Sequence, residues 1–399
     1  MPELQRHAPR LPAALWALMF GNCIIGTGVM IVPGTLNNIS SSLAVPVPVA
    51  GQLISAAALM MCLGAPLFAT LVAQWDRKRL LTLSLLWYGV MHLLSATMPG
   101  FASLMVVRVL SVISPAIFTP QAAACIGQLV PASQRGRAIS LVFLGWSIAS
   151  VLGIPLGAWI GGTLGWRAAF ALVGLLSFVS AVWVWRVMPD GVKPPAFTLG
   201  AWRETLQSRP LMLCVAVTAL FSAGQFVQFA YLAPYLKALF DVTPLQLSLV
   251  FAWFGAFGFA GNLWVSRHID RLGASRAVML SMGGMALSLA LWPLGSNLLL
   301  AALVLVPWAL GCFAANSAQQ ARLSGISPAL ASGSIALNTS AIYAGQAVGA
   351  ASGGWLIALG QMRMLHWAGL AGMGLALLAS WLATRSARSA RQAPGHPVN

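Results

Sequence analysis

Charged residues are scarce in this sequence, and acidic residues are the scarcest. Only 7% of the 399 residues are charged, and Asp and Glu together number 6. A soluble domain carries about 25% charged residues, so this chain has too few to cover a water-exposed surface. Apolar residues make up 59%, which indicates that most of the outer surface faces lipid. The formal net charge of +16 lies in clusters between apolar runs, a pattern typical of membrane loops and not of nucleic-acid binding.

Several patterns that carry chemistry are also missing. The five cysteines all lie inside apolar runs without metal-ligand spacing, so we expect core residues and neither a disulfide nor a metal site. The sequence has no HExxH motif, no cluster of histidines and no pair of acidic residues inside an apolar run. These absences argue against an enzyme and against any cofactor. A GxxxxGK[ST] loop is missing as well, which disfavours an ATP-driven pump.

Long apolar runs are what the sequence does contain. Each run is long enough to cross a hydrocarbon core of about 30 Å as a helix, and lipid offers the backbone no other hydrogen-bonded form. The first run is too long for a signal peptide, so we interpret it as a retained span. The predicted fold is therefore an all-α integral membrane protein with twelve transmembrane helices, at residues 12–36, 47–72, 80–98, 102–128, 138–163, 167–187, 211–237, 246–266, 275–294, 297–320, 331–358 and 364–384.

Basic residues are distributed very unequally between the two sides of these spans. Eighteen Lys and Arg residues lie in the two ends of the chain and the even-numbered loops, against three in the odd-numbered loops, namely Arg167, Lys237 and Arg363. Cytoplasmic loops are enriched in basic residues. We therefore expect both termini to be cytoplasmic.

The longest polar stretch separates spans six and seven. It runs over residues 188–210 and contains Pro189, Pro194 and Pro195. We expect an N-terminal six-helix bundle at 1–187, a cytoplasmic linker at 188–210, and a C-terminal six-helix bundle with a short basic tail at 211–399.

Short motifs occur at regular places between the spans. After span eight the chain reads Asp270-Arg271-Leu272-Gly273, an Asp-Arg-x-Gly sequence at a cytoplasmic turn. After span two, Asp76-Arg77-Lys78-Arg79 keeps only the basic part, because Ala73 stands in the aspartate position. Arg108 lies inside span four, and Arg135-Gly136-Arg137 precedes span five.

Span five itself contains Gly153-Ile154-Pro155-Leu156-Gly157. In this order and spacing, the segments resemble the major facilitator superfamily, and within it the bacterial twelve-helix drug–proton and sugar-efflux antiporters. The resemblance covers nearly the whole chain. It implies two six-helix bundles around a central cavity that opens alternately to either side, and an antiporter-like motif formed by Gly153, Pro155 and Gly157.

The resemblance also assigns a gating role to charged residues at the cytoplasmic turns. The alternative is that these charges only fix the topology. The expected gating residues are Arg77, Arg135, Arg137, Asp270 and Arg271.

Glycines recur at four-residue spacing in spans five and eleven, as Gly153, Gly157 and Gly161 and as Gly345, Gly349 and Gly353. Such a spacing places them on one helix face and allows close helix contact. We expect these two faces to lie where the bundles move against each other.

Arg108 is the single charge in the interior of a span, where it costs about 2.5–3.5 kcal/mol on insertion scales. No span contains a carboxylate partner, so its expected partners are Gln121, Asn22 or backbone carbonyls. His92, one span earlier, is eight residues from Gly100, as Arg108 is, and should lie at a similar depth. A proton-carrying role for His92 and Arg108 competes with plain packing of the histidine.

Polar residues in the helices that line the cavity of this fold are the candidates for contact with substrate. Any of them could instead bond between helices. The candidates are Asn22, Arg108, Gln225, Gln228, Tyr231, Asn316 and Asn338.

The function that best fits is a secondary transporter in a bacterial inner membrane. It would export a small molecule, such as a drug-like compound, a sugar or a similar metabolite, as a monomer in the lipid bilayer. Protons are one possible coupling ion, although no intramembrane carboxylate is present to carry them. The alternatives are an uptake symporter or facilitator of the same fold, and a membrane sensor or structural protein without transport.

Overall fold

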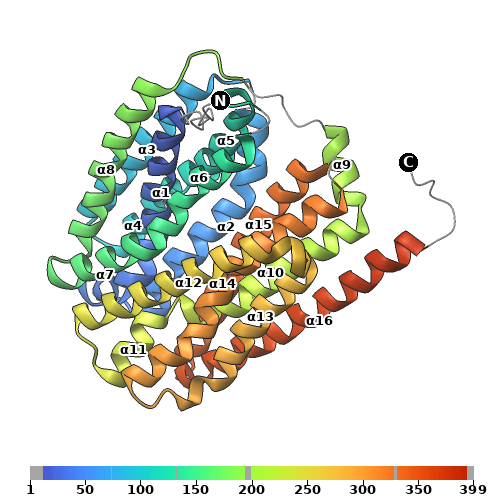
Figure 1. Cartoon of the computed structure of the whole chain (residues 1–399). Helices are drawn as coiled ribbons and strands as arrows, with labels where there is room; N and C mark the ends of the chain where they lie inside the picture. The colour runs from blue at the N-terminus through green and yellow to red at the C-terminus, as the bar shows by residue number, and fades with distance from the viewer. Residues whose placement is uncertain (1–11, 73, 132–133, 194–198, 328–329, 393–399) are drawn as a thin grey trace, which may run out of the picture.

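The computed structural model describes residues 12–72, 74–131, 134–193, 199–327 and 330–392, and over these residues every regular element is a helix. Figure 1 shows two groups of helices joined by α9: the first runs from blue to green, and the second from yellow-green to red. The all-α fold expected from the sequence is confirmed.

The first group holds spans one to six. Span four is broken at Val112 into α4 and α5, and span five passes through a π-helical turn, η2, between α6 and α7. The elements are α1 (Ala13–Ser42), α2 (Val47–Leu71), α3 (Arg77–Thr97), α4 (Phe101–Ser111), α5 (Ile113–Leu129), α6 (Arg135–Ile148), η2 (Ala149–Gly153), α7 (Ile154–Thr163) and α8 (Trp166–Val187).

The second group holds spans seven to twelve. Span seven is broken at Ala230 and Tyr231 into α10 and α11. The elements are α10 (Arg209–Phe229), α11 (Leu232–Phe240), α12 (Pro244–Leu272), α13 (Ala274–Leu291), η3 (Trp292–Leu294), α14 (Leu298–Ile326), α15 (Ala331–Ala358), η5 (Met362–Met364) and α16 (Leu365–Gln392). Between the groups, α9 (Leu199–Gln207) is a short helix inside the segment expected to be a linker.

Eleven segments among the described residues are long and apolar enough to cross a membrane. The remaining expected span, 331–358, is present as α15 with the same bounds. It is rich in Gly, Ser and Ala, which lowers its hydropathy while allowing neighbouring helices to approach closely. With twelve spanning segments among the described residues, the start of α1 and the end of α16 lie on one face, here named the termini face. The opposite face is named the far face.

The two glycine ladders pack helices of the same bundle together. Cβ atoms at Gly153 and Gly161 would meet side chains of α1, namely Thr27 and Thr35. In the second bundle Gly345, Gly349 and Gly353 pack on the backbone of α10. The close helix packing expected from the glycine spacing is confirmed. Each ladder packs on the first helix of its own half, so the expectation that these faces lie where the bundles move against each other is wrong.

Contact between the bundles is made by α2 with α15, by α12 with α7 and η2, and by α1 with α11. Near the far face, a Cβ at Gly162 would meet the ring of Pro244. Deeper, Gly255 of α12 lies on the backbone of Ser150 in η2. Figure 1 shows α12 running beside α7, where the two groups meet. These contacts join the bundles through the half of the molecule nearer the far face.

Candidate functional site

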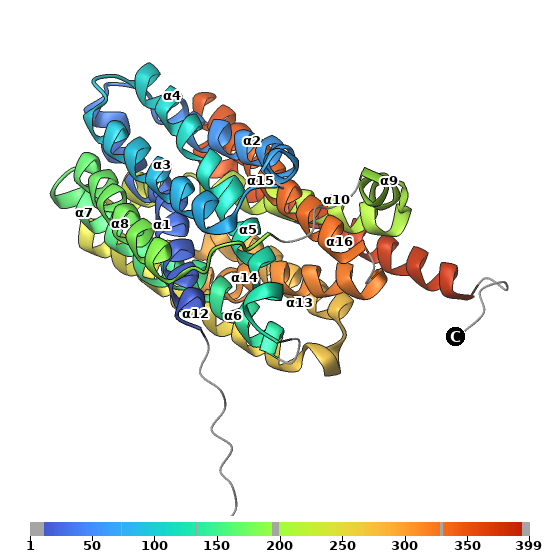
Figure 2. The same ribbon diagram turned by 90° about the horizontal axis from the view of Figure 1, so that it is seen from above.

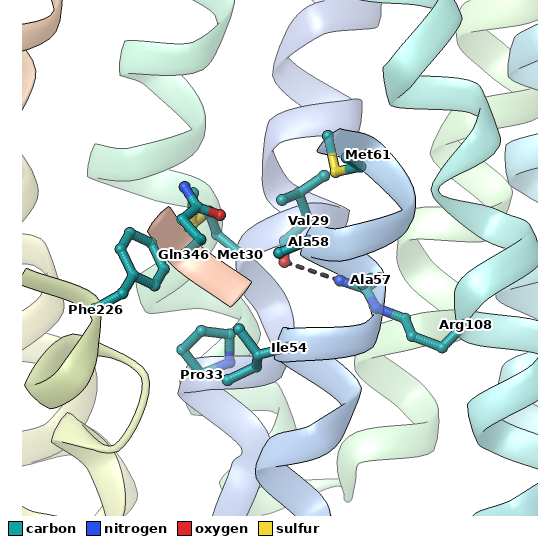
Figure 3. A pocket seen from close by; sticks show the side chains of 10 residues that line it. All are labelled: Val29, Met30, Pro33, Ile54, Ala57, Ala58, Met61, Arg108, Phe226 and Gln346. Atoms are coloured by element: carbon teal, nitrogen blue, oxygen red, sulfur yellow. Dashed lines mark hydrogen bonds between the residues drawn. The ribbon is translucent and has the colours of Figure 1, made fainter. Parts of the chain in front are cut away.

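A small pocket lies between the two bundles in the interior of the molecule (Figure 3). Its volume is about 20 Å³, which admits about one water molecule. The lining is mostly apolar, with one cation and one amide. It comes from both bundles: Val29, Met30 and Pro33 of α1, Ile54, Ala57, Ala58 and Met61 of α2, Arg108 of α4, Phe226 of α10 and Gln346 of α15.

Arg108 reaches the pocket from α4 and is held by α1. Its Nη1 donates to the Gly28 carbonyl and its Nη2 to the Val29 carbonyl, both at 2.9 Å. Val29 lies four residues before Pro33, and proline has no N–H, so no helical partner exists for that carbonyl. Arg108 supplies the missing donor. Backbone carbonyls were among the partners expected from the sequence, and this expectation is confirmed.

The Nε donor of Arg108 remains unpaired. The side chain is 2% exposed, and its Nε–H has no hydrogen-bond partner among the residues described. Figure 3 shows the guanidinium at the edge of the pocket, pointing toward Val29. A buried cation with neutral partners and a spare donor favours an incoming polar or anionic group.

His92 lies next to this arrangement but outside the pocket lining. Its ring packs against Tyr88 and Phe170, with centroids at 4.1 and 5.7 Å, and it is fully buried. A Cβ at Gly28 would meet His92 Nε2, while Arg108 binds the carbonyl of the same glycine. The predicted similarity in depth of His92 and Arg108 is thus confirmed. The histidine contacts α1 from inside the N-terminal bundle.

Two of the expected substrate-contacting residues are hydrogen-bonded inside their own bundles. Asn22 is fully buried, donates to the Val142 carbonyl at 3.1 Å and accepts from Thr119 at 2.8 Å. In the C-terminal bundle, Asn338 accepts from Thr218 at 2.6 Å. Neither side chain lines the pocket.

The other expected contacts also lie away from the pocket lining. Asn316 accepts from Asn338 Nδ2 at 3.4 Å, and Gln225 accepts from Trp308 Nε1 at 3.4 Å. Gln228 is fully buried, and its amide has no hydrogen-bond partner among the described residues. Of the seven candidates, only Arg108 lines the pocket in this conformation.

Tyr231 lies between the bundles near the far face. Its hydroxyl donates to the Ala350 carbonyl at 2.8 Å and is in close contact with Gly51 of α2. Because glycine presents no side chain there, the tyrosine ring can lie against the backbone of the opposite bundle. The geometry makes Tyr231 a closing contact of the far face.

Gln346 was missed by the sequence reasoning. It lies on α15 next to Gly345, is 7% exposed and presents its amide to the pocket opposite Arg108. The signal in the sequence was its position directly after Gly345. The glycine face of α15 packs on α10, and the adjoining face of α15 contacts α2 of the other bundle.

The antiporter-like motif holds three helices together. Gly153 and Gly157 pack on Thr27 and Ile31 of α1, while the Pro155 carbonyl accepts from Ser248 of α12 at 2.9 Å. Pro155 is the second residue of α7, in the first turn after the π-helical turn η2, and proline cannot donate a backbone hydrogen bond there. The motif thus joins the inner surface of its own bundle to the opposite bundle.

The expected gating residues divide into two kinds at the termini face. Arg77 is buried, and its Nη1 donates to the carbonyls of Val72 and Trp75 at 3.0 and 2.6 Å. Arg135, Arg137, Asp270 and Arg271 are all exposed. Over the part of the chain that the structure describes, no group of three His, Cys, Asp or Glu side chains is suited to a metal.

Comparison with known proteins agrees with this arrangement. The family model of the Major Facilitator Superfamily matches residues 18–335 and 216–398. The chain belongs to this superfamily. Its members are transporters, and the chain is accordingly a multi-pass membrane transporter and not an enzyme.

Individual relatives in the superfamily cover most of the chain. A chloramphenicol resistance protein from Streptomyces lividans is 33% identical over 71% of this chain and 72% of its own length. The inner membrane transport protein YdhP of Escherichia coli K12 is 29% identical over 87% and 89%. Among solved structures, a D-xylose–proton symporter superimposes with a TM-score of 0.75 at 18% identity, covering 92% of this chain and 97% of that one. At that identity the likeness supports the fold alone.

Proposed function

We propose that this protein exports a small molecule across a bacterial inner membrane by alternating access. The observation that carries the proposal is the pocket itself, because it is lined by both bundles and lies next to the buried Arg108. A site shared by two bundles changes its access when they rock against each other. The pocket is too small for a metabolite in this conformation, so binding requires the bundles to separate.

The pocket lining indicates the chemistry of the substrate. Arg108 and Gln346 offer donors for a polar or anionic group, while Met30, Met61 and Phe226 offer an apolar wall. Pockets of this composition suit a molecule with an apolar body and a few polar groups. A drug-like compound fits this description better than a highly hydroxylated sugar.

Two observations support export. The relative from Streptomyces lividans is named for chloramphenicol resistance, and a transporter that lowers the internal concentration of a toxic compound gives resistance. The Gly153–Pro155–Gly157 motif is similar to one associated with antiporters and contacts both bundles. Uptake is the alternative for a transporter of this fold, and a measurement of the direction of transport distinguishes it from export.

Transport is best tested in proteoliposomes with purified protein. We expect uptake of chloramphenicol or a related apolar amide compound into vesicles whose protein faces the reverse way, since export then fills the lumen. Gln346→Ala should raise the substrate KM about tenfold, the effect expected for one lost hydrogen bond in a buried site. The matched control is Gln361→Ala, an exposed glutamine outside the pocket. Equal effects of both variants would contradict the assignment of the pocket.

Coupling is proposed to be weak or absent with respect to protons. No carboxylate lies in the pocket lining, and His92 is packed between Tyr88 and Phe170. The test imposes a pH gradient without a substrate gradient. Uphill accumulation that survives His92→Ala would contradict weak coupling and point to a loop carboxylate, whereas its loss in that variant, with downhill exchange intact, would assign the role to the histidine.

Orientation is proposed from the basic residues, with the termini face toward the cytoplasm. The contacts between the bundles near the far face then close the side away from the cytoplasm, which makes this an inward-facing state. Single cysteines at Gly200 and Arg363 lie on opposite faces in this proposal. An impermeant thiol reagent applied to intact cells should label position 363 and leave position 200 unlabelled. The reverse pattern would overturn the orientation.

A further inference from the structure

A second and much larger cavity lies at the termini face of the C-terminal bundle, away from the pocket between the bundles. Its volume is about 370 Å³. It is bordered by the turn from α12 to α13, the last turns of α14 and Thr384 of α16. Helix α13, which packs on both α14 and α16, is seen from above in Figure 2. The lining residues are Leu272, Gly273, Ala274, Ser275, Arg276, Ala321, Arg322, Gly325, Ile326 and Thr384.

Arg322 forms the buried cation of this cavity. It is 5% exposed, and its guanidinium donates to Ser380 Oγ at 3.0 Å, to the Ser380 carbonyl at 3.2 Å and to Thr384 Oγ1 at 3.1 Å. All three acceptors are neutral. These bonds orient the guanidinium and occupy three of about five N–H donors, but they leave its charge uncompensated, which is costly for a buried cation.

Arg276 adds a second cation at the mouth of the same cavity. It is exposed and lies in the first turn of α13. Within the described part of the chain, the ion pairs closer than 4.0 Å are Lys78–Asp190 and Lys237–Asp241, and neither includes Arg276 or Arg322. The cavity lining itself contains no acidic residue.

The start of α13 contributes further donors. Gly273 precedes the helix without a side-chain cap, and the first turn contains no acidic residue. The backbone N–H groups of Ala274, Ser275 and Arg276 have no partner within the helix, and these three residues line the cavity. Cβ atoms at Gly273 and Gly325 would meet no heavy atom within 4 Å, so the space beside these donors is open.

The N-terminal bundle has an equivalent helix start at α3, and there acidic side chains lie beside it. There the start of α3 is covered by the protein's own chain: Asp190 pairs with Lys78 at 3.1 Å, and the Gly191 N–H donates to Asp76 at 2.7 Å. The chain can turn back because α8 ends at Val187. In the C-terminal bundle α16 continues as a helix to Gln392, no segment turns back among the described residues, and the equivalent place remains a cavity lined by cations.

We propose that this cavity binds a phosphate group, carried either by an anionic lipid headgroup or by inorganic phosphate. Two guanidinium groups, the Ser275 hydroxyl and the N–H groups of a helix start are the donors that phosphate oxygens prefer. The site does not depend on the transported substrate. The bound phosphate supplies negative charge at the start of α13, as Asp190 does at the start of α3 in the N-terminal bundle.

The first experiment measures binding of phosphate to purified protein in detergent, by thermal shift and calorimetry, and then retention of phosphatidylglycerol against phosphatidylcholine by native mass spectrometry. Arg276→Gln should weaken phosphate binding about three- to fivefold, as expected for an exposed charge. Arg322→Gln should weaken it about tenfold or more. Arg203→Gln, an exposed arginine on α9, is the control for general attraction of anions and should leave the affinity unchanged.

A second variant keeps both arginines and closes the space. Gly325→Phe projects a ring into the open cavity, and it should abolish binding without loss of folding because nothing is displaced. Gly374→Phe is the matched control, since a Cβ at that exposed glycine also meets nothing within 4 Å and lies outside the cavity.

The outcomes separate the two sources. Retained phosphatidylglycerol that phosphate displaces only at high concentration assigns a lipid headgroup, and tight phosphate binding without lipid selectivity assigns the free ion. Absence of both kinds of binding in the unmodified protein, or equal losses in Gly325→Phe and Gly374→Phe, would overturn the proposal.

Discussion

Two buried arginines, one in each half of the molecule, donate hydrogen bonds to neutral oxygens within the membrane-spanning helices, but they lie at different depths. Arg108 in span four lies beside the central pocket and binds two backbone carbonyls of α1. Arg322 in span ten lies near the termini face and binds Ser380 and Thr384 of α16. Both guanidinium groups are oriented by neutral oxygens and keep their charge available. The difference in depth places one charge where both bundles meet and the other where a single bundle ends.

The comparison predicts the largest effect for the deeper arginine. Arg108→Gln should reduce the initial rate of transport about 30- to 100-fold, because a buried charged donor worth about 2–3 kcal/mol is lost at the pocket. Arg108→Lys should restore little, since one ammonium cannot serve two carbonyls with the geometry of a guanidinium. The measurement is transport at matched protein levels, with the exposed Arg363→Gln as control. Wild-type rates in Arg108→Gln would show that the pocket does not need its cation.

The second expected effect is on thermal stability and concerns the hydrogen bond between Arg108 and α1. If it replaces the N–H that Pro33 lacks, Arg108→Gln leaves the Val29 carbonyl unpaired at a cost of about 1–3 kcal/mol. Pro33→Ala restores a backbone donor for that carbonyl, so the double variant should regain most of the lost thermal stability. Pro307→Ala, which removes a proline from inside α14, is the matched control and should rescue nothing. Equal stability of Arg108→Gln with and without Pro33→Ala would break the link between the two residues.

The third effect separates the loops after spans two and eight. Asp76 caps α3 by accepting from the Arg79 N–H at 3.2 Å and also binds the linker at Gly191, whereas Asp270 is exposed. Asp76→Ala should therefore cost about 1 kcal/mol of stability through the lost cap. Asp270→Ala should leave stability unchanged and slow transport severalfold, if the loop forms its gating contacts in the opposite state.

For transport, the direct comparison uses amides, because asparagine caps a helix about as well as aspartate. Asp270→Asn should impair transport more than Asp76→Asn. Comparable losses in both variants at matched expression would show that the two loops share one role.

The helices could be predicted from the sequence because each span is a long run of apolar residues. Lipid requires about twenty apolar residues in each crossing helix, and the observed bounds of α15 match the predicted 331–358. Arg108 could be identified for the same reason, since a charge inside an apolar run is rare and costly. The breaks at Val112 and Ala230 were not predicted, because neither position carries a proline or glycine.

The rest of the site could not be predicted, because residue type does not determine how a helix is rotated. Asn22 and Gln346 are both amides on helices that border the pocket, yet Asn22 faces Thr119 and Val142 of its own bundle. On α15 the glycine ladder packs on α10, and in that rotation Gln346 lines the pocket. The spacing of residues in the sequence predicts which side chains share a helix face. It does not predict which other helix that face will contact.

The smallest expected effect comes from the two ion pairs, which differ in what they connect. Lys78 is 14% exposed, lies over the Trp185 ring at 5.0 Å and joins the linker to the bundle through Asp190. Lys78→Ala should cost about 1 kcal/mol. Lys237 on α11 and Asp241, the residue directly after that helix, form an exposed pair at 2.5 Å, and Lys237→Ala should leave the unfolding midpoint unchanged within error.

Acidification provides the corresponding pH test. The hydrogen bond and the charge of Lys237 lower the pKa of Asp241 below its ordinary value. A depressed carboxyl pKa contributes stability that is present above the unfolded pKa and is lost as the pH falls through the folded pKa, which lies below about 3.9. The midpoint of unfolding, measured from pH 7 to 5, should therefore not change through this pair, and Asp241→Asn should follow the unmodified protein over that range. A difference that appears above pH 5 would mean that this carboxyl is not the solvated, paired group of the structure, and would make it the loop acid to test for proton coupling.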